Sequence, residues 1–198
     1  MKKLISVFIF LIISSTYVFA NQFYVGLDMA KTKVETGIKN VSSNLDEDDT
    51  LMKFTGGYNV DENISIEAFY LDFGEASLSG VAGNRFKIDG STYQFTSSGK
   101  IAISADTMGI GGKYNFYRSE DKKAAVYLLG GIHSWDVSAE VSSNTTSVSA
   151  SDTGTDPYYG FGANYAISES VKANISYQNY EMDSESIDGF VLGLEYGF

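Results

Sequence analysis

The sequence predicts an all-β chain that folds as an eight-stranded, antiparallel, up-and-down β-barrel and crosses a membrane with its strands. Three observations predict this fold. An apolar leader comes first, short segments then alternate apolar and polar residues, and the connections between these segments switch regularly between long and short. In addition, the chain has 20 glycines, 14 tyrosines and 13 phenylalanines but one proline, which suits many antiparallel strands better than helices.

The N-terminal residues have the pattern of an export signal. Lys2 and Lys3 precede an uncharged apolar run that ends in a small residue, Ala20. This pattern predicts a secretory signal peptide over residues 1–20 and one domain over residues 21–198. A signal anchor is the alternative, although the apolar core is short for a spanning helix, which needs about 20 residues.

Charge and cysteine content exclude several classes of function. Without the leader, 12 basic residues remain against 25 acidic ones, a net charge of −13. Such an acidic chain is a poor match for nucleic acid. Because cysteine is absent, disulfides, thiol chemistry and thiolate metal sites are excluded, and stability has to come from the backbone ladder and from packing.

The first half of the mature chain contains four alternating segments. Strands are expected over residues 22–32, 51–60 and 64–73 and, after long loops that include residues 74–99, in a fourth segment that ends at residue 116. In this fourth segment the apolar residues Met108 and Ile110 occupy even-numbered positions, whereas Ile101 and Ile103 occupy odd-numbered positions and would face the other side of a regular strand. A bulge or the membrane edge should therefore lie near Asp106.

The second half contains four more segments. A charged turn at residues 118–123 leads to strands expected over residues 126–133, 158–165, 171–178 and 187–198. The third and fourth of the longer loops are a Ser/Thr-rich loop at 138–156 and a loop at 181–185. Pro157 is tolerated at a strand entrance. The last strand places Phe190, Leu192 and Leu194 on one face and Gly193 on the other, as expected for lipid outside and a crowded lumen inside.

The connections define two unlike ends of the barrel. Three short turns and four longer loops place both termini at the short-turn end, which is the layout of a bacterial outer-membrane barrel with periplasmic termini. Aromatic residues gather at both ends of the strands, as in two interfacial girdles. The turn-side set is Phe23, Tyr58, Phe116, Tyr165 and Phe198, and the loop-side set is Tyr70, Trp135, Tyr159, Tyr177 and Phe190.

On these residues the chain resembles the small OmpA/OmpX-like outer-membrane barrels, over essentially all of residues 21–198. Members of that family end in a signal read by the barrel-assembly machinery, a glycine followed three and five residues later by aromatics. Here these are Gly193, Tyr196 and Phe198, whereas Val191 departs from the usual polar residue. The resemblance implies a monomer in outer-membrane lipid and lipopolysaccharide. No peptidoglycan-binding domain is expected, so the anchoring to the cell wall that some family members provide is not expected of this chain.

Charged residues on the polar faces should meet in the lumen. They are three acids and three bases: Asp28, Glu67, Glu195, Lys53, Lys113 and Lys172. One hypothesis is a gate of ion pairs that could pass ions. A charge-balanced filling is favoured, because an unpaired buried charge costs several kcal/mol and an eight-stranded barrel is just wide enough for side chains to fill. Glu67 is expected to pair with at least one of the lysines.

Neither catalysis nor metal binding is expected. His133 is the single histidine, and Ser134 beside it points to the opposite face of the strand. We interpret His133, next to Trp135, as an interfacial residue. The acidic run at residues 46–49 lacks the spacing and glycine of a calcium loop and is interpreted as solvated. No cofactor is expected.

Two functions remain after these exclusions. The barrel could be a rigid anchor that presents four extracellular loops to a surface ligand, or a narrow porin. A soluble lipocalin-like barrel is a third, weaker alternative. It would expose its polar face to water, whereas here that face alternates glycine with single charges, as crowded inward positions do.

Overall fold

The structure is a computed structural model that describes residues 22–33, 42, 44–46, 48–88, 90–143, 146–183 and 185–198. The expected signal peptide, residues 1–20, lies outside the described residues. Within the described ranges, no helix is long and apolar enough to cross a membrane. The described strands are β1 (Phe23–Lys33), β2 (Asn44–Asp46), β3 (Asp48–Asn59), β4 (Ile64–Gly80), β5 (Arg85–Ile88), β6 (Ser91–Gln94), β7 (Gly99–Arg118), β8 (Ala124–Ser143), β9 (Ser147–Ala166), β10 (Val171–Met182) and β11 (Glu185–Gly197).

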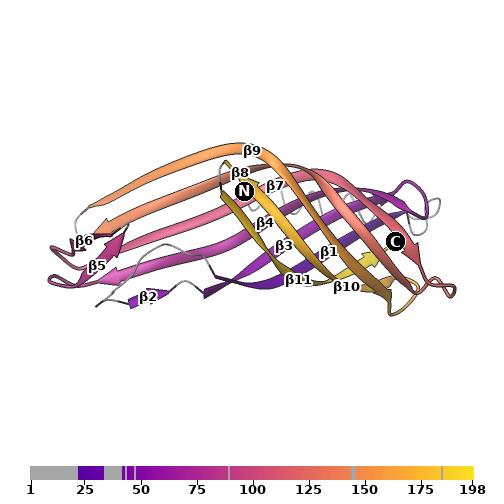
Figure 1. Cartoon of the computed structure of the whole chain (residues 1–198), viewed down its shortest axis with the longest axis horizontal. Helices are drawn as coiled ribbons and strands as arrows, with labels where there is room; N and C mark the ends of the chain where they lie inside the picture. Colours follow the sequence, from indigo (N-terminus) through magenta and orange to yellow (C-terminus); the bar gives the residue numbers. More distant parts are fainter. Residues whose placement is uncertain are drawn as a thin grey trace.

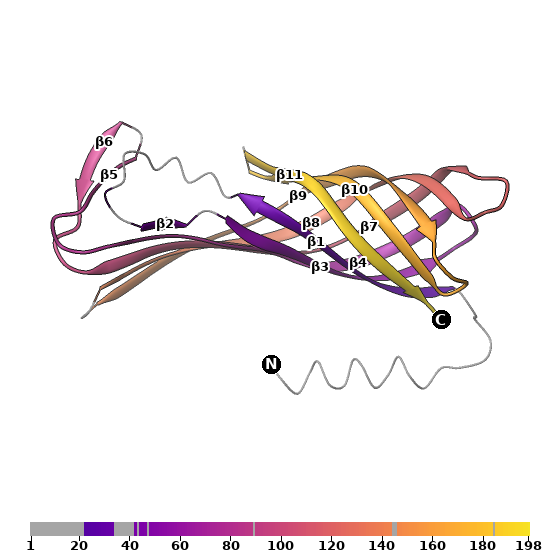
Figure 2. The ribbon, with the colours of Figure 1, turned by 90° about the horizontal axis from the view of Figure 1, so that it is seen from below.

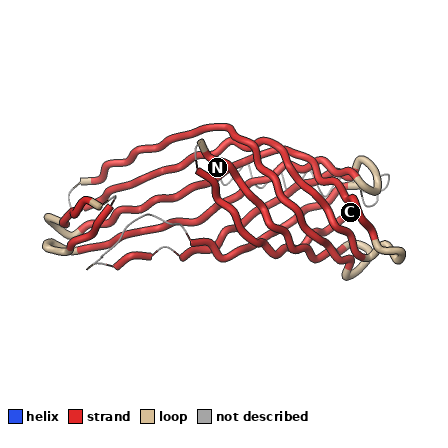
Figure 3. Tube along the Cα trace, viewed as in Figure 1, coloured by secondary structure: helices blue, strands red, loops and turns tan. Residues whose placement is uncertain are grey.

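Eight of these strands close into an antiparallel barrel, which confirms the predicted fold. The sheet order is β2-β4-β3-β1-β11-β10-β9-β8-β7, and an additional pairing between β4 and β7 closes the ring. Figures 1 and 3 show the crossing strands of the barrel at one end of the molecule. The three additional short strands lie outside this ring. β2 pairs with the far part of β4, and β5 and β6 form a separate hairpin.

Side chains alternate across the barrel wall as the sequence predicts. Outward-facing residues such as Ile110 and Leu194 are 59% and 55% exposed, whereas inward-facing Lys53 and Glu67 are almost fully buried. The wall therefore has an apolar outer face and a polar lumen. In β8 both faces of the alternation contain apolar residues, so the sequence leaves its facing open. In the structure Leu129 points inward, and its neighbours Leu128 and Gly130 point outward.

Four strands continue far beyond the barrel. The wing, as we call residues 74–80, 99–105, 137–143 and 147–155 of β4, β7, β8 and β9, is a curved sheet with the β5–β6 hairpin at its far end (Figure 2). The prediction that residues 74–99 and 138–156 are loops is thus wrong for much of their length. Serine and threonine supply 10 of the 19 residues 138–156, and glycine, serine and threonine together supply 12 of the 26 residues 74–99, so their small and polar character hid the strand pattern. Backbone pairing to neighbouring strands stabilises them all the same.

The irregularity predicted near Asp106 lies on the neighbouring strand. The register between β4 and β7 shifts between Asp72 and Gly74, directly beside Asp106, so that β4 carries the bulge at Phe73. Beyond this point Ile101 and Ile103 lie on the inner face of the wing and pair with Leu78 and Ala76. The apolar residues of β7 change from odd to even positions because the wing has an apolar inner face, whereas the barrel has an apolar outer face in contact with lipid.

The girdle prediction is correct for most of its members and wrong for Trp135. Tyr70, Tyr159 and Phe190 are exposed on the outer face, but Trp135 is 6% exposed and points inward. Pro157 lies within β9, opposite Ile132 of β8, and not at the strand entrance. It directly precedes Tyr158, the first residue of β9 that pairs with β10, so the missing amide proton falls where the sheet changes its pairing.

Candidate functional site

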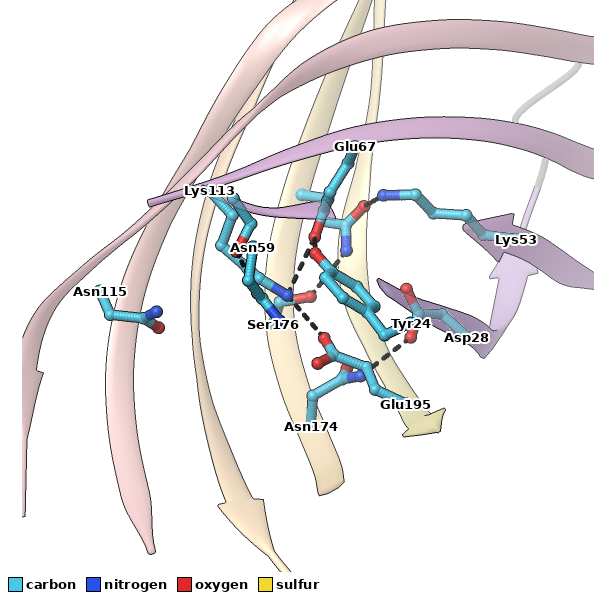
Figure 4. Close-up of polar contacts among 12 residues, drawn as sticks. Tyr24, Asp28, Lys53, Asn59, Glu67, Lys113, Asn115, Asn174, Ser176 and Glu195 are labelled. Carbon is cyan, nitrogen blue, oxygen red and sulfur yellow. Dashed lines mark hydrogen bonds and ion pairs between the residues drawn. The ribbon is translucent and has the colours of Figure 1, made fainter. Parts of the chain in front are cut away.

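The centre of the lumen is a buried cluster of ion pairs. Lys113 of β7 places its Nζ 2.9 Å from Glu67 Oε1 of β4 and 2.7 Å from Glu195 Oε1 of β11 (Figure 4). The Tyr24 hydroxyl donates to Glu67, and the ring of Tyr24 lies 4.6 Å from the Lys113 ammonium. The Tyr127 ring approaches Lys113 from 5.4 Å. One cation therefore holds two acids from different walls together.

Asp28 and Lys53 are cross-strand neighbours that make separate contacts. Asp28 Oδ1 accepts a 3.1 Å hydrogen bond from Asn174 Nδ2. Lys53 Nζ donates to Gln178 Oε1 over 2.9 Å and lies 4.6 Å from the centroid of the Phe69 ring. Amide groups and an aromatic face thus complete the surroundings of both charges, which is how buried ions are satisfied without direct pairing.

Lys172, the sixth predicted lumen charge, lies apart from the central cluster. With Arg118 and Asn115 it lines a cavity of about 330 Å³ near the short turns. Among the described residues, neither Lys172 nor Arg118 makes an ion pair. The sequence therefore found all six residues, and the structure brings Lys113, Glu67 and Glu195 into contact but leaves Lys172 outside that contact.

An aromatic layer fills the lumen on the wing side of the ion cluster, and the sequence analysis missed it. The Tyr158 and Tyr180 rings stack at 5.5 Å, and Phe69 packs edge-on against both. Phe73 contacts Tyr180 in the same manner. The sequence does place these aromatic residues at inward positions of their strands. Alternation along single strands cannot show that their rings meet across the barrel.

The interpretation of His133 as an interfacial residue is wrong. Its side chain is 1% exposed and belongs to this layer. His133 Nδ1 lies 2.8 Å from Thr107 Oγ1, and Nε2 lies 2.8 Å from the backbone oxygen of Glu181. Trp135 Nε1 donates to Asp156 Oδ2 over 2.7 Å. His133 thus links β8 to β7 and β10, and Trp135 links β8 to the neighbouring strand β9.

The residues of the predicted assembly signal lie on opposite faces of β11. Tyr196 and Phe198 are exposed on the outer face. Gly193 faces the lumen, where an added Cβ atom would lie 1.7 Å from Asp28 Oδ1. Glycine at this position therefore has a packing reason of its own, independent of any reading by an assembly factor.

Comparisons with known proteins agree with this architecture. The sequence profile of the outer membrane protein β-barrel domain family matches residues 6–198. The chain belongs to this family. The outward apolar face is accordingly the lipid face of an outer-membrane barrel, and the soluble lipocalin-like alternative is wrong, because that class would bury its apolar face.

Solved structures similar to this outer-membrane barrel are distant in sequence. Ail of Yersinia pestis, in complex with the heparin analogue sucrose octasulfate, aligns with a TM-score of 0.57 at 14% identity, over 91% of this chain and 100% of Ail. The N-terminal barrel of Pseudomonas aeruginosa OprF aligns with a TM-score of 0.56 at 12% identity, over 90% of this chain and 98% of the OprF barrel. Neisserial surface protein A aligns with a TM-score of 0.55 at 15% identity, over 91% of this chain and 100% of that protein. No curated protein sequence matches significantly. These likenesses show the fold alone.

The expected solvated acidic run is only partly described. Glu47 lies outside the described residues. Asp49 accepts hydrogen bonds from the amides of Glu75 and Thr50, both over 2.7 Å, and these two bonds hold the pKa of Asp49 below its usual range. Asp49 therefore links β3 to the start of the wing. Within the described ranges, no group of three His, Asp or Glu side chains is placed to hold a metal ion.

Proposed function

We propose that this outer-membrane barrel is a surface-interaction protein, with the wing outside the cell and the termini in the periplasm. Residues 147–155 of β9 form an edge of the wing that pairs with no second strand among the described residues, and they are the proposed contact with a partner. The signal peptide and the position of the long connections support this orientation. In this proposal the barrel anchors the wing and has no catalytic role.

The open edge is the observation that carries the proposal. The pairing of β9 with β10 ends at Tyr158 and Tyr180, whereas the pairing with β8 continues to Ser147. Among the described residues, the other border of the wing is covered by β2, which pairs with residues 77–79 of β4. An unpaired edge offers backbone amides and carbonyls to an extended segment of a partner, which then adds as a further strand.

Two properties of the edge favour binding. Val148 and Ala150 on its inner face are exposed, next to Val141 and Ala139 on β8, so an added strand would bury apolar surface. Edges that avoid pairing usually carry lysine or proline. In residues 147–155 there is neither, and Asp152 is the single charged residue.

The filling of the lumen supports an anchor over a porin. Between the ion cluster and Asn174, the remaining space is a cavity of about 10 Å³ lined by Asp28, Lys53 and Glu195, among others. This is close to the volume that one water molecule needs, about 10–15 Å³. On the wing side the aromatic layer of Phe69, Tyr158 and Tyr180 follows directly.

A pair of measurements tests the proposal. Protein refolded into planar bilayers should give no discrete current steps, and a laboratory bacterium that displays the protein should adhere to epithelial cell monolayers. Adding lysines at the edge, with Ser149→Lys and Ser151→Lys together, should abolish adherence because charged edges resist strand addition.

The matched control adds the same charge away from the edge. Ser104→Lys and Ser142→Lys place two lysines on β7 and β8, inside the sheet of the wing, and should leave adherence unchanged. Equal adherence of the edge variant and the wild type would contradict strand addition at β9. Reproducible current steps from the wild type would restore the porin alternative.

A further inference from the structure

The cavity of about 330 Å³ at the short-turn end of the lumen has the size and lining of a binding site. Its volume lies at the lower end of the range of small-molecule sites, about 300–1,000 Å³. Among its described lining residues Val60 alone is apolar, and the others are amides, a hydroxyl or charged groups. Arg118 of β7 and Lys172 of β10 line it from strands that are three apart in the sheet. A polar ligand would therefore meet partners on more than one wall.

Two cations of this cavity lack an acid of their own. In the part of the chain that the structure describes, neither Lys172 nor Arg118 has a carboxylate within ion-pair distance. Glu195 attracts Lys172 from a distance, but its Oε1 already contacts Lys113 Nζ at 2.7 Å. Lys113 and Arg118 both repel Lys172. An anion in contact with Lys172 and Arg118 would relieve this repulsion.

The two acids at the rim of the cavity are engaged with other groups. Asp61 Oδ1 accepts hydrogen bonds from the amides of Asn63 and Ile64, both over 2.7 Å. Glu62 Oε2 lies 3.2 Å from Lys122 Nζ. Both acids are exposed, so water and salt screen their repulsion of an anion inside the cavity.

Buried polar atoms without partners define what the ligand must offer. Arg118 Nε, a donor, and two amide oxygens, Asn115 Oδ1 and Gln22 Oε1, are enclosed and have no hydrogen-bond partner among the described residues. Asn115 is 8% exposed, and its side chain points into the lumen (Figure 4). Buried groups of this kind cost free energy unless a ligand or water completes them. The ligand therefore needs acceptor oxygens for the arginine and a hydroxyl donor for the amide oxygens.

We infer that this cavity binds a phosphate group accompanied by a hydroxyl donor. Hydrogen phosphate combines acceptor oxygens with one P–OH group, and its two negative charges balance Lys172 and Arg118. Arginine presents a planar fork that bonds to two phosphate oxygens, whereas lysine supplies a point charge. A small phosphate ester such as glycerol phosphate offers the same chemistry, with the hydroxyl donors on its carbon chain.

Phosphorus NMR titration of the purified protein in a phosphate-free, non-ionic detergent tests this site. The probes are inorganic phosphate and glycerol phosphate at neutral pH and constant ionic strength, with sulfate as a competitor. At least one phosphate probe should bind with a Kd of about 1 mM or below, and the tighter of the two identifies the source of the group. Sulfate should bind at least about tenfold more weakly, equivalent to 1.4 kcal/mol, because it has no O–H group to donate to the amide oxygens.

Three variants separate the charges from the amide oxygens, and a heat-dependent gel shift shows that each is folded. Lys172→Gln keeps a long polar side chain but removes the charge, and should weaken phosphate binding about tenfold. Arg118→Lys keeps the charge but loses the planar fork, and should weaken phosphate binding by a similar factor. Asn115→Leu removes one acceptor and should lower the preference for phosphate over sulfate. The matched control Lys123→Gln removes a cation from the same charged turn, outside the cavity, and should bind phosphate as the wild type does.

Any of three results would overturn the inference. The first is a wild-type protein that shows no saturable change in the resonance of either phosphate probe. The second is competition by sulfate at the same concentrations as phosphate. The third is equal weakening of phosphate binding by Lys123→Gln and Lys172→Gln, since the general positive charge of this end of the barrel would then account for the binding.

Discussion

Replacing Lys113 by methionine should strongly destabilise the barrel. Lys113 is 5% exposed and is the cation that joins Glu67 and Glu195, which are 5% and 8% exposed. Methionine has a similar length and keeps the apolar stem, so the substitution removes mainly the charge and its hydrogen bonds. Two carboxylates would then remain in the lumen without their shared partner.

The magnitude follows from the geometry of the two contacts. At the N–O separations of 2.9 and 2.7 Å in the structure, each attraction is about 6 kcal/mol for an effective dielectric constant of 20. Desolvation of the three ions offsets most of this gain. The net cost of removing one member of a buried pair is about 3–5 kcal/mol, and we expect Lys113→Met to lower the free energy of unfolding by that amount.

Reversible urea unfolding of the protein in lipid vesicles measures this free energy, with gel mobility as the second readout. Glu67→Gln should cost less, because Lys113 keeps Glu195. The neutral triple variant Lys113→Met, Glu67→Gln and Glu195→Gln should regain most of the lost stability, since replacing all members of a buried ion cluster is often neutral. A loss of less than about 1 kcal/mol for Lys113→Met would refute the reasoning, because that is the scale of surface substitutions.

Three further predictions concern the lipid face, the bulge and pH. Leu194→Lys places a charge on the lipid face and should cost about 2–4 kcal/mol, so that the variant fails to accumulate in outer membranes; normal levels would contradict its facing. Gly74→Ala should cost at least about 1–2 kcal/mol, because Gly74 has φ +88° and an added Cβ atom would lie 2.7 Å from Asp49; urea unfolding checks this. Because the pKa of Asp49 is lowered, its stabilising bonds are fully present above the ordinary value of about 3.9 and are lost as pH falls through the lowered one. Protection of the Glu75 amide against exchange, relative to the intrinsic rate at each pH, should fall only in that acid range, and protection that already falls near pH 5 would argue against this bond.

The predicted parts of the fold are those that depend on local alternation. Leu192 and Leu194 alternate with Gly193 and Glu195 along the chain. Because one face of this strand must meet lipid, the facing of β11 follows from the sequence alone. The wing was not predicted, because Ser149 and Ser151 alternate only with Val148 and the small Ala150, which is a weak strand pattern in a segment rich in serine and threonine. Their strand conformation depends on pairing with β8, which is a long-range contact.

The lumen shows the same division. Except on β8, whose facing the sequence left open, parity along each strand predicted which side chains point inward, and the six predicted lumen charges are among them. Only the tertiary structure decided that Lys113 joins Glu67 to Glu195, that Lys53 turns to Phe69 and Gln178, and that His133 is enclosed by aromatic rings. Partner choice depends on the stagger between strands that are distant in the chain, and side-chain alternation within a single strand contains no information about that stagger.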